Sequence, residues 1–531
     1  MWEKGWRDKT WSILDTAWDL IVIGGGITGA GILRETARAG LRVLLVEAHD
    51  FASGTSSRSS KLVHGGFRYL KNGQIKLTLE SVRERERLLR EGRGLVFPLG
   101  FLMACFQRDK IPAWVFGAGL ALYDLLALKW GHRYYDAFDI CELCPPLNKA
   151  GLRGGYRYFD AQADDARLVL RLIQDAVRDG GIAINYARAS LLRHPKSGQV
   201  CGVAIEDRSP GGNGRTLEAQ ANVVINATGA WADDLRTQIG ARPRLRKLRG
   251  SHLIFPSNRL PLTRAVSFLH PQDGRPVFAI PWEGITLLGT TDVDHGPALQ
   301  ADPVISPEEV EYLMVAAHRA FPAQELTSQD IQATFSGVRP VIGTGKTDPS
   351  KESREHVLWC ENGLITVAGG KLTTFRLMAR DALKEACAHL PDQAKRQLAK
   401  VTNLHVLDSP SVEEIAGEKL SPAVRLRLSG RYSVAAPSVV ASAAPGELEP
   451  VSGLSTLWAE LRWAARAEGV VHLDDLLLRR VRLGLLLPEG GIQVMDRIRS
   501  TIQDELGWDD DRWSQEVIRY TNLWKRCYHF G

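Results

Sequence analysis

The sequence predicts an α/β fold that contains a Rossmann-like dinucleotide-binding unit and a helical C-terminal region. An apolar strand and a glycine-rich turn, residues 19–26, lead directly into a helix. A second apolar strand, residues 42–46, ends in the acid Glu47. This strand–turn–helix–strand order with a terminal acid is typical of a dinucleotide-binding βαβ unit. Near the other end of the chain, residues 457–506 carry helical periodicity.

Each glycine of the turn has its own structural reason. Gly24 allows the tight turn, Gly26 lets the backbone approach a pyrophosphate, and Gly29 lets the helix pack closely on the strand. The helix N-terminus faces the phosphates with unpaired N–H groups and a partial positive charge. Glu47 is expected to accept hydrogen bonds from a ribose, and its charge argues against a 2′-phosphate.

Composition sets limits on the class of protein. The chain has 531 residues, of which 44% are hydrophobic and 24% charged, so we expect two or three folded domains rather than disorder. The net charge of +6 permits contact with anionic substrates or an anionic membrane face. Nucleic acid is only a weak alternative, and we expect no nucleic-acid partner.

Cysteine usage and the N-terminus indicate a reducing compartment. The seven cysteines are scattered, which disfavours a disulfide framework. Cys141 and Cys144 form a CxxC motif without a second pair, so we expect two ordinary thiols and no metal site. Residues 1–18 lack the apolar core of a secretory signal.

The stretch after the second strand narrows the class of cofactor. Residues 54–70 read Gly-Thr-Ser-Ser-Arg-Ser-Ser-Lys-Leu-Val-His-Gly-Gly-Phe-Arg-Tyr-Leu. A serine-rich solvated loop is the alternative, but such loops seldom continue into Lys, His, Arg and Tyr around a Gly-Gly pair. The stretch resembles the signature of the FAD-dependent glycerol-3-phosphate dehydrogenases.

The resemblance recurs in the same order further along the chain. It covers about residues 19–531, and residues 95–152 are the least alike. The segment 226–231 is similar to the flavoprotein segment that borders the bound dinucleotide. The other matching blocks lie at residues 250–252, 280–282, 288–292, 336–340 and 369–376.

The resemblance implies a discontinuous Rossmann-like FAD-binding domain, a mixed-sheet substrate domain and a C-terminal helical domain. We expect an FAD-dependent oxidoreductase region at residues 19–400 and a mainly helical domain at residues 401–531. The FAD-binding parts are expected at about residues 19–95, 151–245 and 331–400, and the substrate or cap parts at about 96–150 and 246–330.

The helix expected at residues 78–89 alternates in charge at residues 83–87, which indicates an exposed face.

The resemblance also implies which residues contact FAD. They belong to the glycine turn and its helix, the end of the second strand, the serine-rich loop and two later segments. These residues are Gly24, Gly26, Ile27, Thr28, Gly29, Glu47, Thr55, Ser56, Ser57, Ser59, Lys61, Leu62, His64, Thr228, Gly229, Gly370, Lys371, Leu372, Thr373 and Thr374.

Oxidation of a secondary alcohol needs a hydride acceptor, a group that takes the hydroxyl proton, and cations that hold the developing oxyanion. The resemblance implies hydride transfer from sn-glycerol 3-phosphate to N5 of FAD, which yields dihydroxyacetone phosphate. It assigns Arg68, Tyr69 and Lys371 to the substrate. It assigns Arg339 to the hydroxyl or nascent ketone and His252 to proton transfer. His252 has the alternative of a core histidine bonded to a backbone carbonyl.

An apolar segment, residues 111–128, bears on the electron acceptor. Pro112 and Asp124 are among the residues that interrupt it, so a single membrane span fits badly. With its basic flanks it resembles a patch seated on one face of a membrane, and the alternative is a buried helix in a cap. We therefore expect a cytoplasmic protein that is peripheral on the cytoplasmic face of the cell membrane.

The chain shows no second nicotinamide fold and no iron–sulfur ligand set, so electrons must leave to a quinone, to oxygen or to a separate protein. The membrane patch favours a quinone. Oxygen, as in glycerol-3-phosphate oxidases of the same family, is the first alternative. A flavin-fold protein that binds a partner without turnover is the second, and a homodimer is left open.

Overall fold

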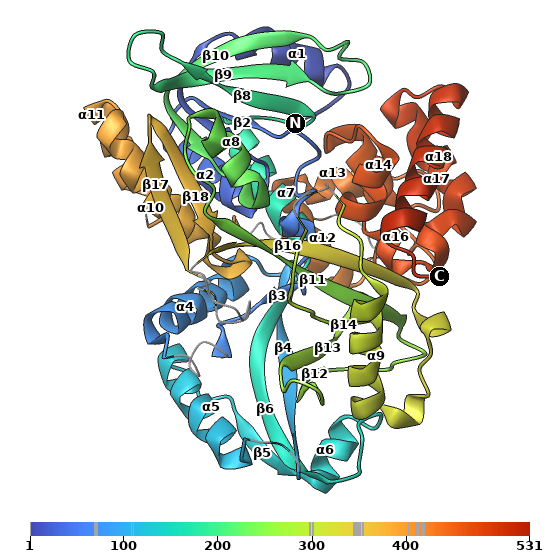
Figure 1. Cartoon of the computed structure of the whole chain (residues 1–531). Coiled ribbons are helices and arrows are strands. Elements are labelled where there is room, and N and C mark those ends of the chain that lie inside the picture. The colour runs from blue at the N-terminus through green and yellow to red at the C-terminus, as the bar shows by residue number, and fades with distance from the viewer. Residues whose placement is uncertain are drawn as a thin grey trace.

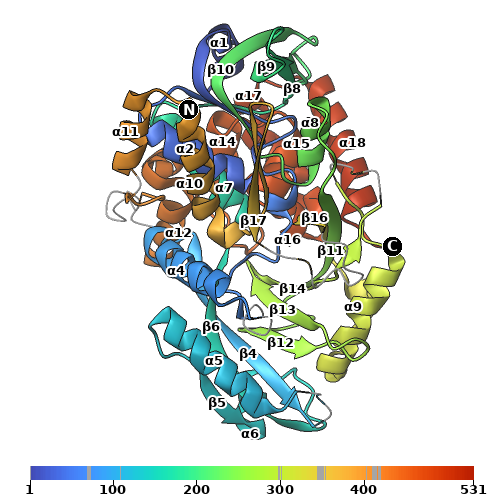
Figure 2. The same cartoon turned by 60° about the vertical axis from the view of Figure 1, so that its left-hand side comes forward.

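The computed structural model describes residues 2–67, 73–107, 109, 111–296, 299, 302–343, 352, 355–401, 403–408, 415 and 420–531. Figures 1 and 2 show two sheets that meet near the middle of the molecule, with the C-terminal helices packed on one side of their junction. The predicted combination of a Rossmann-like domain, a mixed sheet and a C-terminal helical domain is confirmed.

The first sheet is the Rossmann-like one, with β17 antiparallel at one edge and a hairpin of β8 and β9 attached to β10. Its central strands are parallel and apolar because helices or strands cover both faces. The strands are β1 (Ala17–Ile23), β2 (Val43–Val46), β7 (Ile182–Ile184), β8 (Ala187–Arg193), β9 (Val200–Asp207), β10 (Thr216–Asn226), β17 (His356–Glu361) and β18 (Leu364–Gly369).

One face of this sheet carries α2 (Ile27–Arg38), α7 (Asp165–Arg178) and α10 (Phe375–Ala386), which share one buried core with Leu20 and Val43. The opposite face packs against α1 (Trp6–Leu14), α8 (Ala232–Gln238) and the β8–β9 hairpin. The turn between β1 and α2 lies at the carboxyl edge of the sheet, where ligands of open α/β sheets bind.

The second sheet is mixed, with the order β15-β11-β14-β13-β12-β4-β6-β3 and with β16 on β11 and β5 on β6. Helices α5 (Ala113–Ala127), α6 (Ala137–Leu143) and α9 (Pro307–Ala320) pack around it. Its strands are β3 (Leu62–Val63), β4 (Val96–Phe106), β5 (Arg133–Asp136), β6 (Leu152–Ala163), β11 (Leu245–Pro256), β12 (Ala265–Leu269), β13 (Pro276–Trp282), β14 (Ile285–Gly289), β15 (Val293–Asp294) and β16 (Ala333–Ile342).

The C-terminal region is helical, as its periodicity predicts. Its core shares apolar side chains with the second sheet, among them Trp282 and Phe335. The helices are α12 (Pro422–Tyr432), α13 (Ala436–Ala441), α14 (Trp458–Ala467), α15 (Leu473–Asp475), a π-helical turn (Leu476–Arg480), α16 (Leu483–Leu486), α17 (Met495–Leu506) and α18 (Asp510–Cys527). Helix α11 (Asp392–Val401) connects α10 to this region.

Two of the expected FAD-binding parts begin with strands of the second sheet. They begin at about residues 151 and 331, where β6 pairs with β4 and β16 pairs with β11. Both strands therefore belong to the second sheet. Long antiparallel pairing with distant partners decides their place, and that pairing leaves no local trace in the sequence.

The expectation of an exposed face at residues 83–87 is wrong for Glu84 and Arg85, which are buried on α4 (Ile75–Glu91). The Arg85 guanidinium donates to Asp160 and to the hydroxyl of Tyr123, at 2.8 Å each. Glu84 accepts from Arg376 of α10. The alternating charges are buried because partners from β6, α5 and α10 neutralise them.

Candidate active site

A cavity of about 1780 Å³ lies where the two sheets meet. This exceeds the roughly 300–1,000 Å³ that is usual for a site that holds one drug-sized ligand. Its wall contains residues of both sheets, the serine-rich loop, helix α5 and the C-terminal region. The space is therefore suited to an extended ligand together with a second, smaller molecule.

The glycine turn forms one end of the cavity. Gly24 has φ +111°, and a Cβ there would lie 2.6 Å from the carbonyl oxygen of Ala227. A Cβ on Gly29 would lie 1.9 Å from the carbonyl oxygen of Gly24, so both positions require glycine. The first N–H groups of a helix have no partner within it, and that of Ile27 in α2 donates to the hydroxyl of Ser56. The start of α2, with its partial positive charge, fits the pyrophosphate of a dinucleotide.

Glu47 and His472 lie at this end as well. Glu47 accepts from the N–H groups of Gly25 and His49, at 2.6 and 2.8 Å, and burial raises its pKa above the usual value. The predicted contact of Glu47 with a ribose stays a prediction. His472 of the C-terminal region also lines the cavity, and its Nδ1 lies 2.8 Å from Glu516. Sequence reasoning missed His472 because it lies outside the recognised motifs.

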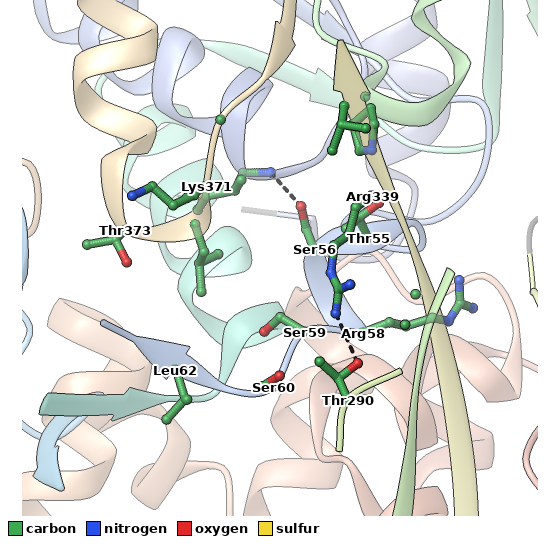
Figure 3. Close-up of a pocket in the computed structure, with 18 of the residues that line it drawn as sticks. Thr55, Ser56, Arg58, Ser59, Ser60, Leu62, Thr290, Arg339, Lys371 and Thr373 are labelled. Carbon is green, nitrogen blue, oxygen red and sulfur yellow. Dashed lines mark hydrogen bonds between the residues drawn. The ribbon is translucent and has the colours of Figure 1, made fainter. Parts of the chain in front are cut away.

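Most residues of the serine-rich loop line the cavity, whereas Ser57 and Lys61 do not. The Oγ of Ser56 accepts from the N–H of Ile27 at 2.9 Å, which ties the loop to the start of α2. Thr55 donates to the carbonyl of Val338 at 2.5 Å, which ties it to β16. Figure 3 shows Ser56, Ser59 and Ser60 of this loop between the segment with Lys371 and the strand with Arg339.

Most residues predicted to contact FAD line the cavity, but four do not: Gly29, Ser57, Lys61 and Thr374 are absent from its wall. The Lys61 ammonium is fully buried and donates to the carbonyl of Ser57 and to Asp165. The predicted residues on the wall are Gly24, Gly26, Ile27, Thr28, Glu47, Thr55, Ser56, Ser59, Leu62, His64, Thr228, Gly229, Gly370, Lys371, Leu372 and Thr373.

His252 lies on β11 at the cavity wall, 1% exposed. Its Nε2 is 2.8 Å from the Oγ of Ser60, and its ring stacks on Phe335 with centroids 4.6 Å apart. Its Nδ1 is buried with no hydrogen-bond partner among the described residues. Burial, with the charges of Arg339 and Lys61, holds the pKa of His252 well below its ordinary value of 6.5. The imidazole is therefore neutral and available to accept a proton.

Arg339 projects from β16 into the same part of the cavity. Its guanidinium donates to the hydroxyl of Thr290 at 2.9 Å, drawn in Figure 3, and to Asp292 at 3.0 Å. Arg275 also contacts Asp292, at 3.3 Å, and lines the cavity. Two guanidinium groups thus share one carboxylate here, which leaves this wall attractive to an anion. Asp292 and Arg275 were not among the predicted site residues.

Lys371 lies across the cavity from Arg339, in the turn after β18 (Figure 3). Its Nζ donates to the hydroxyl of Ser81 of α4 at 2.6 Å. The carbonyl of His64 accepts from the hydroxyl of Thr373 at 3.2 Å, which holds the Gly-Gly stretch next to the same turn. Arg68 and Tyr69, predicted to bind the substrate, lie outside the described residues.

A further lobe of the cavity is apolar. It runs between β4, which contributes Phe101 and Met103, and helix α5, which contributes Val115, Phe116 and Leu122. The opposite side of α5 is exposed to solvent. The same cavity is therefore lined by His252, Arg339 and Lys371 and by apolar side chains of α5.

The described residues contain no group of three or more His, Cys, Asp or Glu side chains that could hold a metal ion. Cys144 of the CxxC motif is buried, and burial raises the pKa of its thiol to about 12. Its neighbours in the apolar core include Leu147 and Ile140.

Two family models match the chain. Residues 19–376 match the FAD-dependent oxidoreductases, and residues 376–513 match the C-terminal domain of alpha-glycerophosphate oxidase. The boundary between the two matches lies at residue 376. The predicted boundary lies at residue 400.

Two relatives with similar sequences are both named glycerol-3-phosphate dehydrogenases. "Glycerol-3-phosphate dehydrogenase 2" of Mycobacterium tuberculosis is 34% identical over 97% of this chain and 89% of its own. "Aerobic glycerol-3-phosphate dehydrogenase" of Staphylococcus saprophyticus is 33% identical over 88% of this chain and 87% of its own.

A solved structure shares the whole fold. The glycerol-3-phosphate dehydrogenase of Bacillus halodurans, complexed with FAD, superposes with a TM-score of 0.76 and 28% identity, covering 99% of this chain and 98% of that one. The glycine cradle at the start of α2 fits the same cofactor. The chain therefore belongs to the family of FAD-dependent glycerol-3-phosphate dehydrogenases.

Proposed function

We propose that this enzyme oxidises sn-glycerol 3-phosphate to dihydroxyacetone phosphate and passes the electrons to a membrane quinone. The observation that carries the proposal is the continuity of one cavity. It joins a dinucleotide cradle, walls that carry His252, Arg339 and Lys371, and an apolar lobe beside the exposed helix α5. The names of the relatives support the substrate.

The cations around the cluster support a phosphorylated substrate. Arg339 offers a planar fork for a phosphate or an oxyanion, and Lys371 offers a point charge from the opposite wall. By its motif, Arg68 would supply a third charge. Three cations match a dianionic phosphate better than an uncharged polyol. We assign Arg68, Tyr69 and Lys371 to the phosphate end and Arg339 to the oxygen that becomes the ketone.

His252 is suited to take the hydroxyl proton. FAD, when bound, supplies the acceptor for the hydride that leaves the carbinol carbon. The neutral imidazole then accepts the hydroxyl proton, either directly or through the Ser60 hydroxyl 2.8 Å from Nε2. Burial is the main cause that lowers the pKa of His252, and the charge of Arg339 adds to it. A bound dianion would offset the Arg339 part and so raise the pKa of His252 towards its ordinary value.

The surface of α5 supports membrane binding and a quinone. Trp114 is 70% exposed, Leu125 65% and Leu128 91%. Trp130 and Phe138, which follow in the chain, are also exposed. Clusters of exposed large apolar side chains mark interaction sites, and tryptophan favours the membrane interface. A quinone from the lipid phase would reach the cavity through the adjacent apolar lobe.

The described helices include none that combines the length and the apolar character needed to cross a membrane. We propose that α5 binds at the interface of the cell membrane, on its cytoplasmic face. Leu120 of α5 is fully buried and packs into the core, so it anchors the helix to the protein rather than to lipid.

Oxygen is the first competing acceptor, and a binding protein without turnover is the second. Anaerobic reduction of the flavin by substrate, followed by mixing with either quinone-containing vesicles or aerated buffer, separates all three. We expect the flavin absorbance to recover faster with the vesicles. Faster recovery in aerated buffer would favour an oxidase. A flavin that substrate never bleaches would favour a binding protein.

A further inference from the structure

The side of the serine-rich loop that faces away from the cavity rests on one carboxylate. Asp165, the first residue of α7, is fully buried. Its Oδ2 accepts from the N–H of Ser59 at 2.9 Å and from the Ser59 hydroxyl at 2.7 Å. Both of its oxygens lie 2.9 Å from the Lys61 ammonium. Ser59 also lines the cavity, so Asp165 sets where this part of the flavin-facing loop lies.

A second support of the loop comes from the C-terminal region. Arg482 precedes α16 and is 1% exposed. One of its terminal nitrogens donates to the carbonyl of Ser57 at 2.8 Å and to Oδ1 of Asp165 at 3.0 Å. The other donates to the carbonyl of Leu478 at 2.7 Å, which fixes the guanidinium to its own segment.

The charged groups around Asp165 form a larger network than a simple ion pair. Arg482 and Lys61 are two cations that share Asp165, with Asp164 3.7 Å from Arg482. Burial and the charge of Arg482 lower the pKa of Lys61 to about 8. Removal of one member would leave its partners charged and buried, which is costly. Asp165, Lys61 and Arg482 each bond to the backbone of the loop, and Arg482 also bonds to the backbone of the π-helical turn.

We propose that Arg482 is a positioning residue for the flavin. It acts through Ser57 and Asp165 to hold the loop in the shape that places Ser59 and Ser60 on the cavity wall. The C-terminal helical domain then completes the cofactor site of the Rossmann-like domain. The inference concerns only FAD and does not depend on the proposed substrate or acceptor.

Release of FAD from the holoenzyme tests the proposal, because flavin fluorescence rises when FAD dissociates on dilution. Loss of a charge-assisted hydrogen bond in Arg482→Gln should raise the Kd for FAD roughly 10- to 100-fold. Arg482→Lys keeps the charge and one contact, so it should restore most of the affinity. If Arg482→Gln does not fold, Arg482→Lys is measured instead, and we expect a smaller rise in its Kd for FAD.

A matched control distinguishes positioning from general destabilisation. Arg427 is another buried arginine of the C-terminal domain, but its charged partners are Glu460 and Glu283, neither of which belongs to the loop. Arg427→Gln should lower the melting temperature while it leaves the Kd for FAD unchanged. An equal rise in Kd for Arg427→Gln and Arg482→Gln would overturn the proposal.

Hydrogen exchange of the holoenzyme gives a local readout. Peptides that cover residues 55–62 should exchange faster in Arg482→Lys than in the parent, because the Ser59 amide is bonded to Asp165. Peptides that cover the glycine turn, residues 24–31, should exchange at the parent rate. Unchanged exchange at residues 55–62 together with an unchanged Kd would show that Arg482 serves the C-terminal domain alone.

Discussion

The Nε2 of His252 lies 2.8 Å from the hydroxyl oxygen of Ser60, and this contact joins strand β11 of the second sheet to the serine-rich loop of the Rossmann-like domain. The two sides of the cavity are therefore connected at the place where we propose that a proton leaves the substrate. A buried, neutral imidazole at this position is suited to a base and poorly suited to a phosphate contact.

Replacement of His252 should slow chemistry without loss of the cofactor. We expect His252→Ala to lower the rate of anaerobic flavin reduction by about 10² to 10⁴, which is the usual contribution of a general base. FAD should stay bound, because His252 is not part of the glycine cradle. Stopped-flow absorbance of the flavin measures the rate. A rate near that of the parent would make His252 a structural core residue.

The lowered pKa of His252 predicts a pH dependence of stability. Below its ordinary pKa of 6.5 the unfolded chain binds a proton at His252, whereas the folded chain does not until much lower pH. The unfolded state therefore gains protons first, and stability falls as the pH drops below about 6.5. Replacement of His252 by Asn should remove the contribution of His252 to this loss of stability at acid pH. Denaturant unfolding of parent and variant at neutral and acid pH tests it, and parallel curves would contradict it.

Removal of Arg68 should weaken substrate binding. This residue lies outside the described part of the chain, so the prediction rests on its motif and on the cations opposite. A charge-assisted contact is worth about 1.5 to 3 kcal/mol, so Arg68→Ala should weaken apparent binding of sn-glycerol 3-phosphate roughly ten- to a hundredfold. Arg259→Ala is the control, since Arg259 pairs with Asp330 outside the cavity wall. Unchanged steady-state constants for Arg68→Ala would reject its assignment.

Membrane binding should depend on the exposed face of α5. Trp114 and Leu125 are exposed and do not line the cavity. Their joint replacement by Ser should increase the soluble fraction and slow quinone reduction, while reduction of a soluble dye stays nearly unchanged. High salt alone should not release the parent fully, because apolar burial adds to charge.

The control for this variant is Ile518→Ser, since Ile518 is 62% exposed on α18 of the C-terminal domain. It should bind membranes like the parent. If the α5 double variant also sediments with membranes and reduces quinone like the parent, α5 is a cap helix and the quinone proposal loses its structural support.

Local chemistry made the cofactor cradle predictable. The requirement for glycine at residues 24 and 29 follows from backbone conformation and close packing, and both act within a few residues. The resemblance to the family assigned His252, Arg339 and Lys371 to the site, and all three line the cavity. Their roles in the reaction stay predictions.

Long-range pairing was not predictable in the same way. The partners of Arg85 and Lys61 come from distant parts of the chain, so their burial and orientation have no local signal. Asp165 and Arg482 were missed for the same reason. Helix α5 is apolar nearly all round, so its sequence alone could not show that Leu120 faces the core while Trp114 faces solvent.

Anaerobic mixing of the purified holoenzyme with sn-glycerol 3-phosphate, followed by flavin absorbance, tests the central claim most directly. It examines the cofactor and the substrate in one trace, without any acceptor. We expect rapid bleaching of the oxidised flavin by sn-glycerol 3-phosphate and far slower bleaching by glycerol or lactate, which lack the phosphate. Absence of bleaching by sn-glycerol 3-phosphate, or equal rates with glycerol, would contradict the proposed reaction.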